Sequence, residues 1–306
     1  MAGLAILCSG QGKQDTAMFE RLRSYPEAMA IEAKIRASGV LPADCDNSDL
    51  CFRNDIAQPL ICLYQAMVWE IIKPRLPEPD IFAGYSVGEL SAYGCAGAFS
   101  PTELIRLATI RGRLMQDAAV VPQAMIAILG LNRRQLEHLA ADFEAYIAII
   151  NAADHFVLGL PTVRLDALLT AATIAGATRA VHLPVTAASH TPFMMQAAQT
   201  FNQALQSTEF QSIHGSILAG ISGEKVFTKA QMITTLAAQI HQTIDWQACL
   251  EEAFSYGCRV FLELGPGDSL TRMTREVLSG VEVRSVSEFH DLYAVGKWIA
   301  TAMCRQ

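Results

Sequence analysis

The stretch FAGYSVGEL, residues 82–90, strongly constrains the fold of this chain, because it sets a serine between two glycines directly after a short apolar run. The pattern G-x-S-x-G is typical of a strand that turns sharply into a helix, where the serine takes a strained backbone conformation that small neighbours permit. Such a turn exposes the Ser86 hydroxyl and aims the amide of Val87 at the place where an oxyanion would form. Ser86 is therefore a candidate nucleophile, and an ordinary strand-to-helix turn is the alternative that five residues leave open.

An α/β pattern surrounds this turn. Residues 4–8 and 81–83 read as short parallel strands that end in glycine turns, and residues 56–76 read as a buried helix between them. Later in the chain we expect a helix from about residue 193, strands at 216–221 and 259–265, and helices at 229–244 and 246–257. The fold class predicted from this order is α/β with a parallel sheet.

Residues 122–186 carry a different pattern. Their apolar runs and helical periodicity follow the order β-α-β-β-α-β, which is the order of a ferredoxin-like module. We therefore predict a discontinuous large domain, residues 1–121 and 187–306, with a small subdomain of residues 122–186 inserted into it.

Composition excludes several classes of function. The net charge of −7 and the lack of a long basic run argue against nucleic acid or an anionic membrane as the main partner. No stretch approaches the roughly 18 apolar residues that span a bilayer. The eight cysteines form no C-x-x-C pair, so the chain shows neither a zinc knuckle nor a redox dithiol, and reduced thiols fit a cytoplasmic protein. The apolar start, MAGLAILCSGQG, lacks a basic n-region and reads as a buried first strand.

Two further stretches add candidate site residues. SGQGKQ, residues 9–14, follows the first strand, which in a parallel sheet places Gln11 beside the serine turn, although a tight turn with a solvated glutamine fits equally. RGRLMQDA, residues 111–118, lies within or just after the helix that follows the serine. Arg111 could clamp a substrate carboxylate in bidentate fashion, or lie solvated on a helix face.

A serine nucleophile needs a general base, and His190 is the best-placed histidine. It lies in ASHTPFMM, on the loop where the chain returns from the inserted module, and catalytic groups are often found on such loops. Most of the other histidines read as structural, since His138 lies in a charged helix, His290 near the C-terminus, and His155 and His182 inside the inserted module. The remaining two are His214 and His241.

These motifs together resemble those of malonyl-CoA:acyl carrier protein transacylases, from about residue 4 to residue 275. The resemblance implies a large domain related to the α/β-hydrolases with a ferredoxin-like insertion. The matching segments are GQGKQ at 10–14, GYSVGE at 84–89, RGRLMQ at 111–116, SHTP at 189–192 with Met195, Gln239 upstream of Trp246, and FLELGPGDSLTRM at 261–273.

The resemblance also implies a role for each residue. Ser86 would attack the thioester of malonyl-CoA with His190 as base, and the malonyl group would pass from the serine to the pantetheine thiol of an acidic acyl carrier protein. Amides of Gln11 and Val87 would hold the oxyanion, and Arg111 would grip the malonyl carboxylate. The main-chain carbonyl at Gln239 would orient the histidine, so no catalytic aspartate and no permanently bound cofactor is required. Asp245, Glu263 and Asp268 then read as structural, and Glu89 as a residue that favours the helix dipole.

Several positions depart from the family pattern. Tyr85 replaces a histidine, Lys13 a serine, Ser9 a proline and His155 a glutamine, and Ser189 stands where malonyl-selective members often carry phenylalanine. A smaller Ser189 leaves room at the α-carbon, so methylmalonyl groups could be tolerated. The variants GYSVGEL and ASHTP resemble the transacylase subunit of malonate decarboxylase, which favours the carrier protein of that complex as acceptor.

Three alternatives remain at this stage. The first is a transacylase of fatty acid or polyketide synthesis, and the second is a serine esterase, which a guanidinium beside an apolar acyl chain disfavours. The third is a noncatalytic subunit that only docks a carrier. For the carrier itself we expect a basic docking surface that includes Arg113, Arg272 and Arg275.

Overall fold

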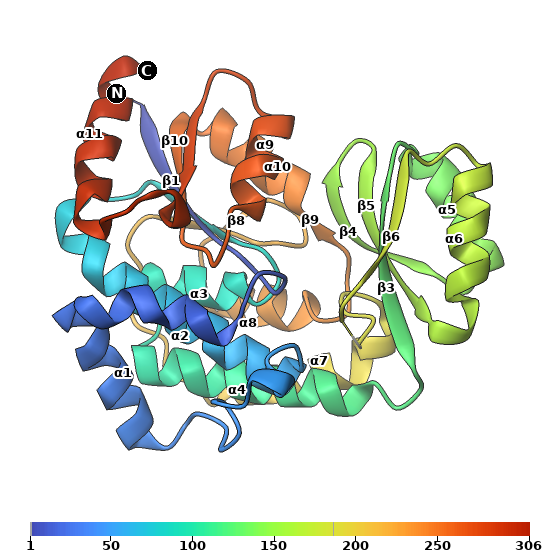
Figure 1. Cartoon of the computed structure of the whole chain (residues 1–306), viewed down its shortest axis with the longest axis horizontal. Coiled ribbons are helices and arrows are strands. Elements are labelled where there is room, and N and C mark those ends of the chain that lie inside the picture. Colours follow the sequence, from blue (N-terminus) through green and yellow to red (C-terminus); the bar gives the residue numbers. More distant parts are fainter. Residues whose placement is uncertain (1, 186) are drawn as a thin grey trace.

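The computed structural model describes residues 2–185 and 187–306, and its largest sheet has six strands in the order β11-β10-β1-β2-β7-β8 (Figure 1). Neighbouring strands are parallel except β7 and β8. Cys8 pairs with Gly84 at the ends of β1 and β2, so the turns that follow these two strands meet at one edge of the sheet. The strands are β1 Gly3–Cys8, β2 Ile81–Gly84, β7 Ser216–Leu218, β8 Lys225–Val226, β10 Cys258–Glu263 and β11 Glu282–Ser285.

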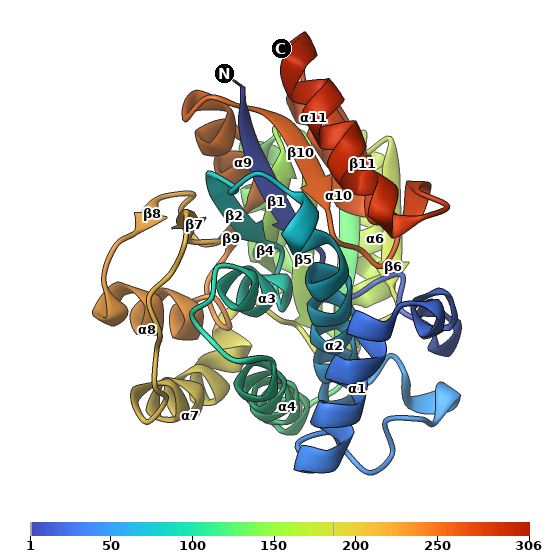
Figure 2. The same ribbon diagram turned by 90° about the vertical axis from the view of Figure 1, so that its left-hand side faces the viewer.

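Both faces of this sheet are covered by other elements (Figure 2). Leu4 and Ile6 of β1 join a core with α2, α3, α4, α7, α8 and α11, whereas Ala5 and Leu7 join a second core with α9 and α10. A strand buried on both faces reads as a continuous apolar run, which is why LAILC predicts it. The helices are α1 Pro26–Ser38, α2 Asn54–Ile72, α3 Gly88–Cys95, α4 Pro101–Ala118, α7 Met195–Gln206, α8 Lys229–Ala238, α9 Trp246–Ser255, α10 Ser269–Val277 and α11 Val295–Arg305.

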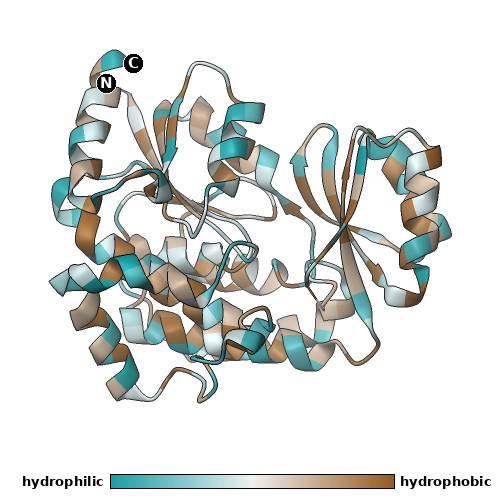
Figure 3. Cartoon of the chain, viewed as in Figure 1, coloured by the Kyte–Doolittle hydropathy of each residue, from teal (hydrophilic) through white to brown (hydrophobic). Residues whose placement is uncertain are grey.

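A second sheet of five strands has the order β6-β3-β5-β4-β9. One of its faces packs with α5 and α6, and the other shares the core that contains α9. Both helices carry hydrophobic and hydrophilic residues (Figure 3), and Leu136 of α5 and Leu168 of α6 are among the apolar residues that pack into the core with the sheet. The elements are β3 Gln123–Leu129, α5 Arg133–Asp142, β4 Tyr146–Ala152, β5 His155–Pro161, α6 Leu165–Ile174, β6 Arg179–Leu183 and β9 Ile244–Asp245.

The predicted α/β class with a parallel sheet is confirmed, and the β-α-β-β-α-β order is found between Gln123 and Leu183. The domain limits at residues 121, 122 and 187 stay a prediction, and the predicted limit at residue 186 lies outside the described residues. Several expected bounds were wrong. The strand expected at 216–221 ends at Leu218, and the strand expected at 259–265 ends at Glu263. The helix expected at 229–244 ends at Ala238, because Ile244 pairs with β4 instead. The stretch from Arg111 lies on α4, the second helix after the serine, because α3 already ends at Cys95.

Candidate active site

Ser86 lies in the turn between β2 and α3, with a backbone φ of 55°. The flanking glycines are required by close backbone contacts. A Cβ on Gly84 would lie 2.2 Å from the carbonyl of Gly88, and a Cβ on Gly88 would lie 2.0 Å from the carbonyl oxygen of Cys8. These distances forbid any side chain at either position, so the sharp turn depends on both glycines.

His190 is brought to this turn by the loop that precedes α7, and it also has a positive φ, of 62°. Its Nε2 lies 2.8 Å from the Ser86 Oγ, and its Nδ1 lies 2.5 Å from the main-chain oxygen of Gln239. Because a carbonyl only accepts, Nδ1 carries the hydrogen and Nε2 accepts from the serine hydroxyl. Two candidate residues that lie side by side and both have a positive φ are typical of a strained site.

The protonation state of His190 suits a base. Its side chain is buried, and burial together with the charge of Arg111 lowers the pKa of the imidazole to about 3, although the hydrogen bond to Gln239 opposes this shift. The imidazole is therefore neutral near pH 7 and has a free lone pair facing the serine.

Arg111 is buried on α4 and has amide partners in place of a carboxylate. It donates to the Oε1 of Gln58 at 2.7 Å and to the Oε1 of Gln239 at 2.6 Å, and its Nη2 lies 3.5 Å from the Ser86 Oγ. Burial lowers the pKa of Arg111 to about 10, so the group is still a cation at neutral pH. No carboxylate in the described ranges forms a salt bridge with Arg111. A buried cation held only by neutral amides favours an incoming anion.

Each of the two predicted oxyanion residues is next in the chain to a residue that belongs to the serine turn or is in contact with it. Val87 is the residue before α3, and Gln11 follows Gly10, whose Cβ would lie 2.7 Å from the Tyr85 oxygen and 3.5 Å from the Ser86 Cβ. Within the part of the chain that the structure describes, neither the Val87 amide nor the Gln11 amide donates a hydrogen bond. Both donors are therefore free for a ligand beside Ser86.

The structure also locates the residues that depart from the family pattern. Tyr85 is half-buried; its hydroxyl donates to the Asn151 Oδ1 of β4 at 3.0 Å, and its ring packs edge-on against Trp246. Tyr85 thus links the serine turn to the second sheet. Ser189 precedes His190 and is half-buried, whereas His155 begins β5.

Gln58 is a site residue that no motif indicated. It lies on α2 between apolar residues, it is fully buried, and it also donates to the Asn54 Oδ1 at 3.3 Å. The signal in the sequence is a glutamine on an otherwise apolar helix, since a buried polar side chain needs a partner.

The predicted structural acids have partners outside the site. Asp245 accepts from the Ala248 amide at the start of α9, and Glu263 accepts from the amides of Leu270 and Thr271 in α10. Asp268 pairs with Arg272 at 3.1 Å. The described residues contain no group of three or more His, Cys, Asp or Glu side chains that could hold a metal ion.

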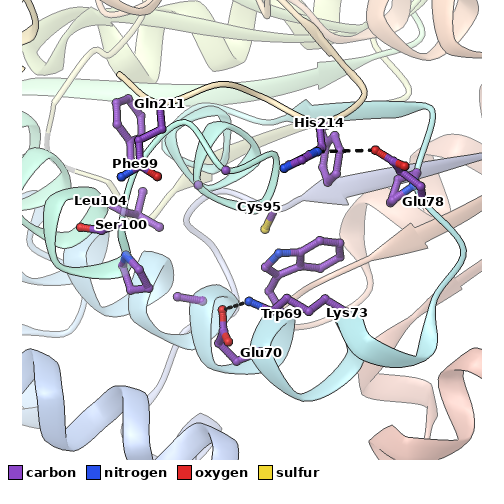
Figure 4. A pocket seen from close by; sticks show the side chains of 16 residues that line it. Trp69, Glu70, Lys73, Glu78, Cys95, Phe99, Ser100, Leu104, Gln211 and His214 are labelled. Carbon is purple, nitrogen blue, oxygen red and sulfur yellow. Dashed lines mark hydrogen bonds and ion pairs between the residues drawn. The ribbon is translucent and has the colours of Figure 1, made fainter. Parts of the chain in front are cut away.

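Two cavities differ in their relation to this centre. One, of about 670 Å³, is lined by His190 itself, by Tyr146 and Ile147 of the second sheet and by the loop at 241–243. Another, of about 630 Å³, is lined by Trp69, Phe82, Phe99 and Leu104, with the ion pairs Glu70–Lys73 and Glu78–His214 beside it (Figure 4). His190 lines only the first of these two cavities, and Ser86 and Arg111 line neither of them.

The chain as a whole matches one protein family, the acyl transferase domain, over residues 6–302. It belongs to that family. The enzyme is therefore an acyltransferase, in agreement with the resemblance drawn from its motifs.

This acyltransferase is similar to several proteins over nearly its whole length. It is 27% identical to the malonyl CoA-acyl carrier protein transacylase of Haemophilus influenzae, across 98% of this chain and 100% of the relative. An acyl carrier protein S-malonyltransferase from Vibrio cholerae superposes with a TM-score of 0.88 at 27% identity, covering 96% of this chain and 100% of that one. A malonyl-transacylase in complex with a type II polyketide synthase acyl-carrier protein superposes with a TM-score of 0.90 at 25% identity. The match covers 97% of this chain and 99% of that one.

Proposed function

We propose that this acyltransferase moves a malonyl group from malonyl-CoA to the phosphopantetheine thiol of an acyl carrier protein, through an ester on Ser86. His190 takes the hydroxyl proton as the Ser86 Oγ attacks the thioester carbonyl. The C–S bond then breaks, and the leaving CoA sulfur takes the proton from Nε2. In the second half, His190 takes the proton of the carrier thiol, the thiolate attacks the ester, and the proton returns to the Ser86 Oγ.

The observation that carries this proposal is that the guanidinium of Arg111 lies beside Ser86 and forms no salt bridge with a carboxylate of the described residues. Its Nη2 lies 3.5 Å from the Ser86 Oγ, and its partners are the neutral amides of Gln58 and Gln239. A malonyl group has a carboxylate at the far end of a short acyl chain, so it can ionically pair with Arg111 while its thioester meets Ser86. Acetyl groups lack that end, and a long apolar acyl chain would leave the guanidinium without a partner.

The amides of Val87 and Gln11 are the proposed oxyanion donors. Removing one such donor typically costs about 2.7–4 kcal/mol of barrier stabilisation. Every step uses side chains and amides of the protein, so the proposed reaction requires no bound cofactor.

For the acceptor we propose the carrier subunit of malonate decarboxylase. The support is the resemblance of GYSVGEL and ASHTP to that branch, with Tyr85 on the serine turn in place of histidine. The alternative acceptor is a carrier of fatty acid or polyketide synthesis. The similarity to the malonyl CoA-acyl carrier protein transacylase of Haemophilus influenzae and to the malonyl-transacylase in complex with a polyketide synthase carrier supports this alternative. Transfer rates from malonyl-CoA to purified carriers of both kinds distinguish the two, because the faster acceptor identifies the pathway.

We propose that an acidic carrier docks near Arg113, Arg272 and Arg275. Each has an acidic neighbour on the surface, Asp117 at 3.7 Å, Asp268 at 3.1 Å and Glu288 at 3.5 Å, which a docked carrier would have to displace or share. Transfer to the carrier should then weaken as salt rises, and salt-independent transfer contradicts an electrostatic dock.

We also propose a cytoplasmic location. All eight cysteines are free and seven of them are buried, which suits a reducing compartment. No helix among the described residues has the length and hydropathy to cross a bilayer.

Intact mass spectrometry tests the proposed function. Malonyl-CoA should add one malonyl group to the wild-type chain and none to Ser86→Ala, whereas acetyl-CoA should barely label either. Equal labelling by the two thioesters would contradict the role of Arg111. Labelling of Ser86→Ala would contradict the nucleophile, and release of free malonate without transfer would favour the esterase.

A further inference from the structure

Glu89 has an unexpected environment. It stands in the first turn of α3 and is fully buried. Its Oε2 accepts from the side-chain amide of Gln239 at 2.6 Å and from the backbone amide of Gly220 at 3.1 Å. A Cβ on Gly220 would lie 2.6 Å from that oxygen, so this close approach depends on the glycine. The expectation that Glu89 chiefly favours the helix dipole therefore leaves out its main contacts.

Gln239 connects Glu89 to both catalytic groups. It caps the end of α8, and its main-chain oxygen holds the Nδ1 of His190. Its side-chain Oε1 accepts from Arg111 at 2.6 Å, and its Nε2 donates to the main-chain oxygen of Ser86 at 2.8 Å as well as to Glu89. Reversing the Gln239 amide would set its Nε2 against the donors of Arg111, and its Oε1 against the acceptor oxygens of Ser86 and Glu89. These partners therefore fix the orientation of the amide.

We propose that Glu89 is a positioning residue that acts through Gln239 on the carboxylate clamp at Arg111 and on the orientation of His190. The proposal rests on the proposed malonyl transfer, since the clamp has meaning only for an acyl group that carries an anion. Without an acceptor at position 89, one N–H of the buried Gln239 amide loses its partner. The side chain then shifts to regain one, and the Oε1 leaves the place that orients Arg111.

Glu89 holds the Gln239 amide through its acceptor oxygen, and the negative charge of the carboxylate is secondary. The Oε1 of Glu89 has no hydrogen-bond partner in the described part of the chain, whereas Oε2 has two. Burial raises the pKa of Glu89 to about 7, although its hydrogen bonds and Arg111 oppose the shift. A proton on Oε1 leaves Oε2 free to accept, so a glutamine at position 89 keeps the acceptor and a methionine removes it.

The test compares the rates at which malonyl-CoA and acetyl-CoA acylate Ser86 in Glu89→Met, Glu89→Gln and a control. Ser91→Ala is the control, because Ser91 is equally buried on α3 and its hydroxyl hydrogen-bonds to no residue, Gln239 included, among those described. Glu89→Met should lower the malonyl-to-acetyl ratio about tenfold or more, while Glu89→Gln and Ser91→Ala stay within about threefold of the wild type. An unchanged malonyl-to-acetyl ratio in Glu89→Met overturns the proposal. A ratio that falls as far in Glu89→Gln as in Glu89→Met overturns it too.

A second comparison tests the path through Gln239. Gln239→Ala keeps the main-chain carbonyl at His190 and removes the side chain, so adding Glu89→Met to it should lower the ratio no further. Additive losses overturn the proposal. If Glu89→Met does not fold, Glu89→Asp takes its place, because it shortens the side chain and should lower the malonyl-to-acetyl ratio in the same way. An unchanged ratio in Glu89→Asp also overturns the proposal. A wild-type chain that malonyl-CoA does not label refutes the proposed function instead, so the two failures are distinguishable.

Discussion

The imidazole of His190 is held by the main-chain oxygen of Gln239, 2.5 Å from its Nδ1, and no carboxylate among the described residues hydrogen-bonds to the ring. A carbonyl fixes the tautomer and the ring plane as an aspartate does in a Ser-His-Asp triad, but it adds no charge. The nearest strong charge is instead that of Arg111, which disfavours an imidazolium. The proposed base is therefore a neutral, buried ring.

This arrangement predicts an unusual pH profile. Because burial and Arg111 lower the pKa of His190 to about 3, its neutral form persists as the pH falls. We expect kcat/KM for Ser86 malonylation to stay level between about pH 8 and pH 5, without the decline near pH 6.5 that an ordinary histidine gives. Stopped-flow acylation measures the profile. Glu89→Gln is the control, because burial raises the pKa of Glu89 to about 7, inside the range of the profile, and glutamine does not titrate. A decline near 6.5 in both chains would contradict the neutral buried base.

Gly88→Ala should disrupt the serine turn, because the added Cβ would lie 2.0 Å from the main-chain oxygen of Cys8. We expect a loss of about 3 kcal/mol or more in the free energy of unfolding, and at least a hundredfold slower acylation. Gly94→Ala on the same helix is the matched control, since its Cβ would meet only the movable end of Leu104 at 2.8 Å. Urea denaturation and acylation rates should separate the two variants, and similar results for both would contradict the prediction.

Tyr85→Phe should lower stability, because the Asn151 Oδ1 would lose its donor at 3.0 Å in a buried place. The expected loss is about 1–3 kcal/mol in the free energy of unfolding, measured by urea denaturation. Tyr256→Phe is the control, since half of Tyr256 is exposed. Equal stability of Tyr85→Phe and the wild type would mean that the link between the serine turn and β4 is unimportant.

Ser189 should set the tolerance for substituents on the α-carbon of the acyl group. It lies next to His190 in the chain and is half-buried, and a serine side chain is much smaller than the phenylalanine that malonyl-selective members of the resembled family often carry there. We expect wild-type Ser86 to accept methylmalonyl-CoA, and Ser189→Phe to lower the methylmalonyl-to-malonyl ratio about tenfold or more. Ser189→Ala should keep the wild-type ratio. Competition between methylmalonyl-CoA and malonyl-CoA, followed by intact mass spectrometry, measures this ratio. If Ser189→Phe leaves the ratio unchanged, the prediction is wrong.

The sequence predicted those parts of the site that depend on short-range chemistry. A serine at a sharp turn needs glycines two residues away on either side, so the pattern is complete within five residues, and close contacts at Gly84 and Gly88 explain it. Strands with both faces buried, such as β1, were also visible as apolar runs.

The rest depends on contacts between distant segments. Glu89 meets Gly220 and Gln239, which lie 131 and 150 residues further along the chain, so no local pattern reveals its role. Strand β9 has two residues, too few for a periodic signal, and its pairing with β4 overrode the helical pattern expected there. Gln58 left only a weak sign, a glutamine in an apolar helix.

The central claim is that the charge of Arg111 selects acyl groups with a carboxylate, and Arg111→Ala tests it most directly. Ser86 acylation rates from malonyl-CoA and acetyl-CoA are measured on this variant and on Arg106→Ala, a surface residue of the same helix that pairs with Glu103. We predict that Arg111→Ala slows malonylation about a hundredfold or more, changes acetylation less than about fivefold, and leaves the fold intact by circular dichroism. An equal loss of both reactions would contradict the claim and make Arg111 a structural residue.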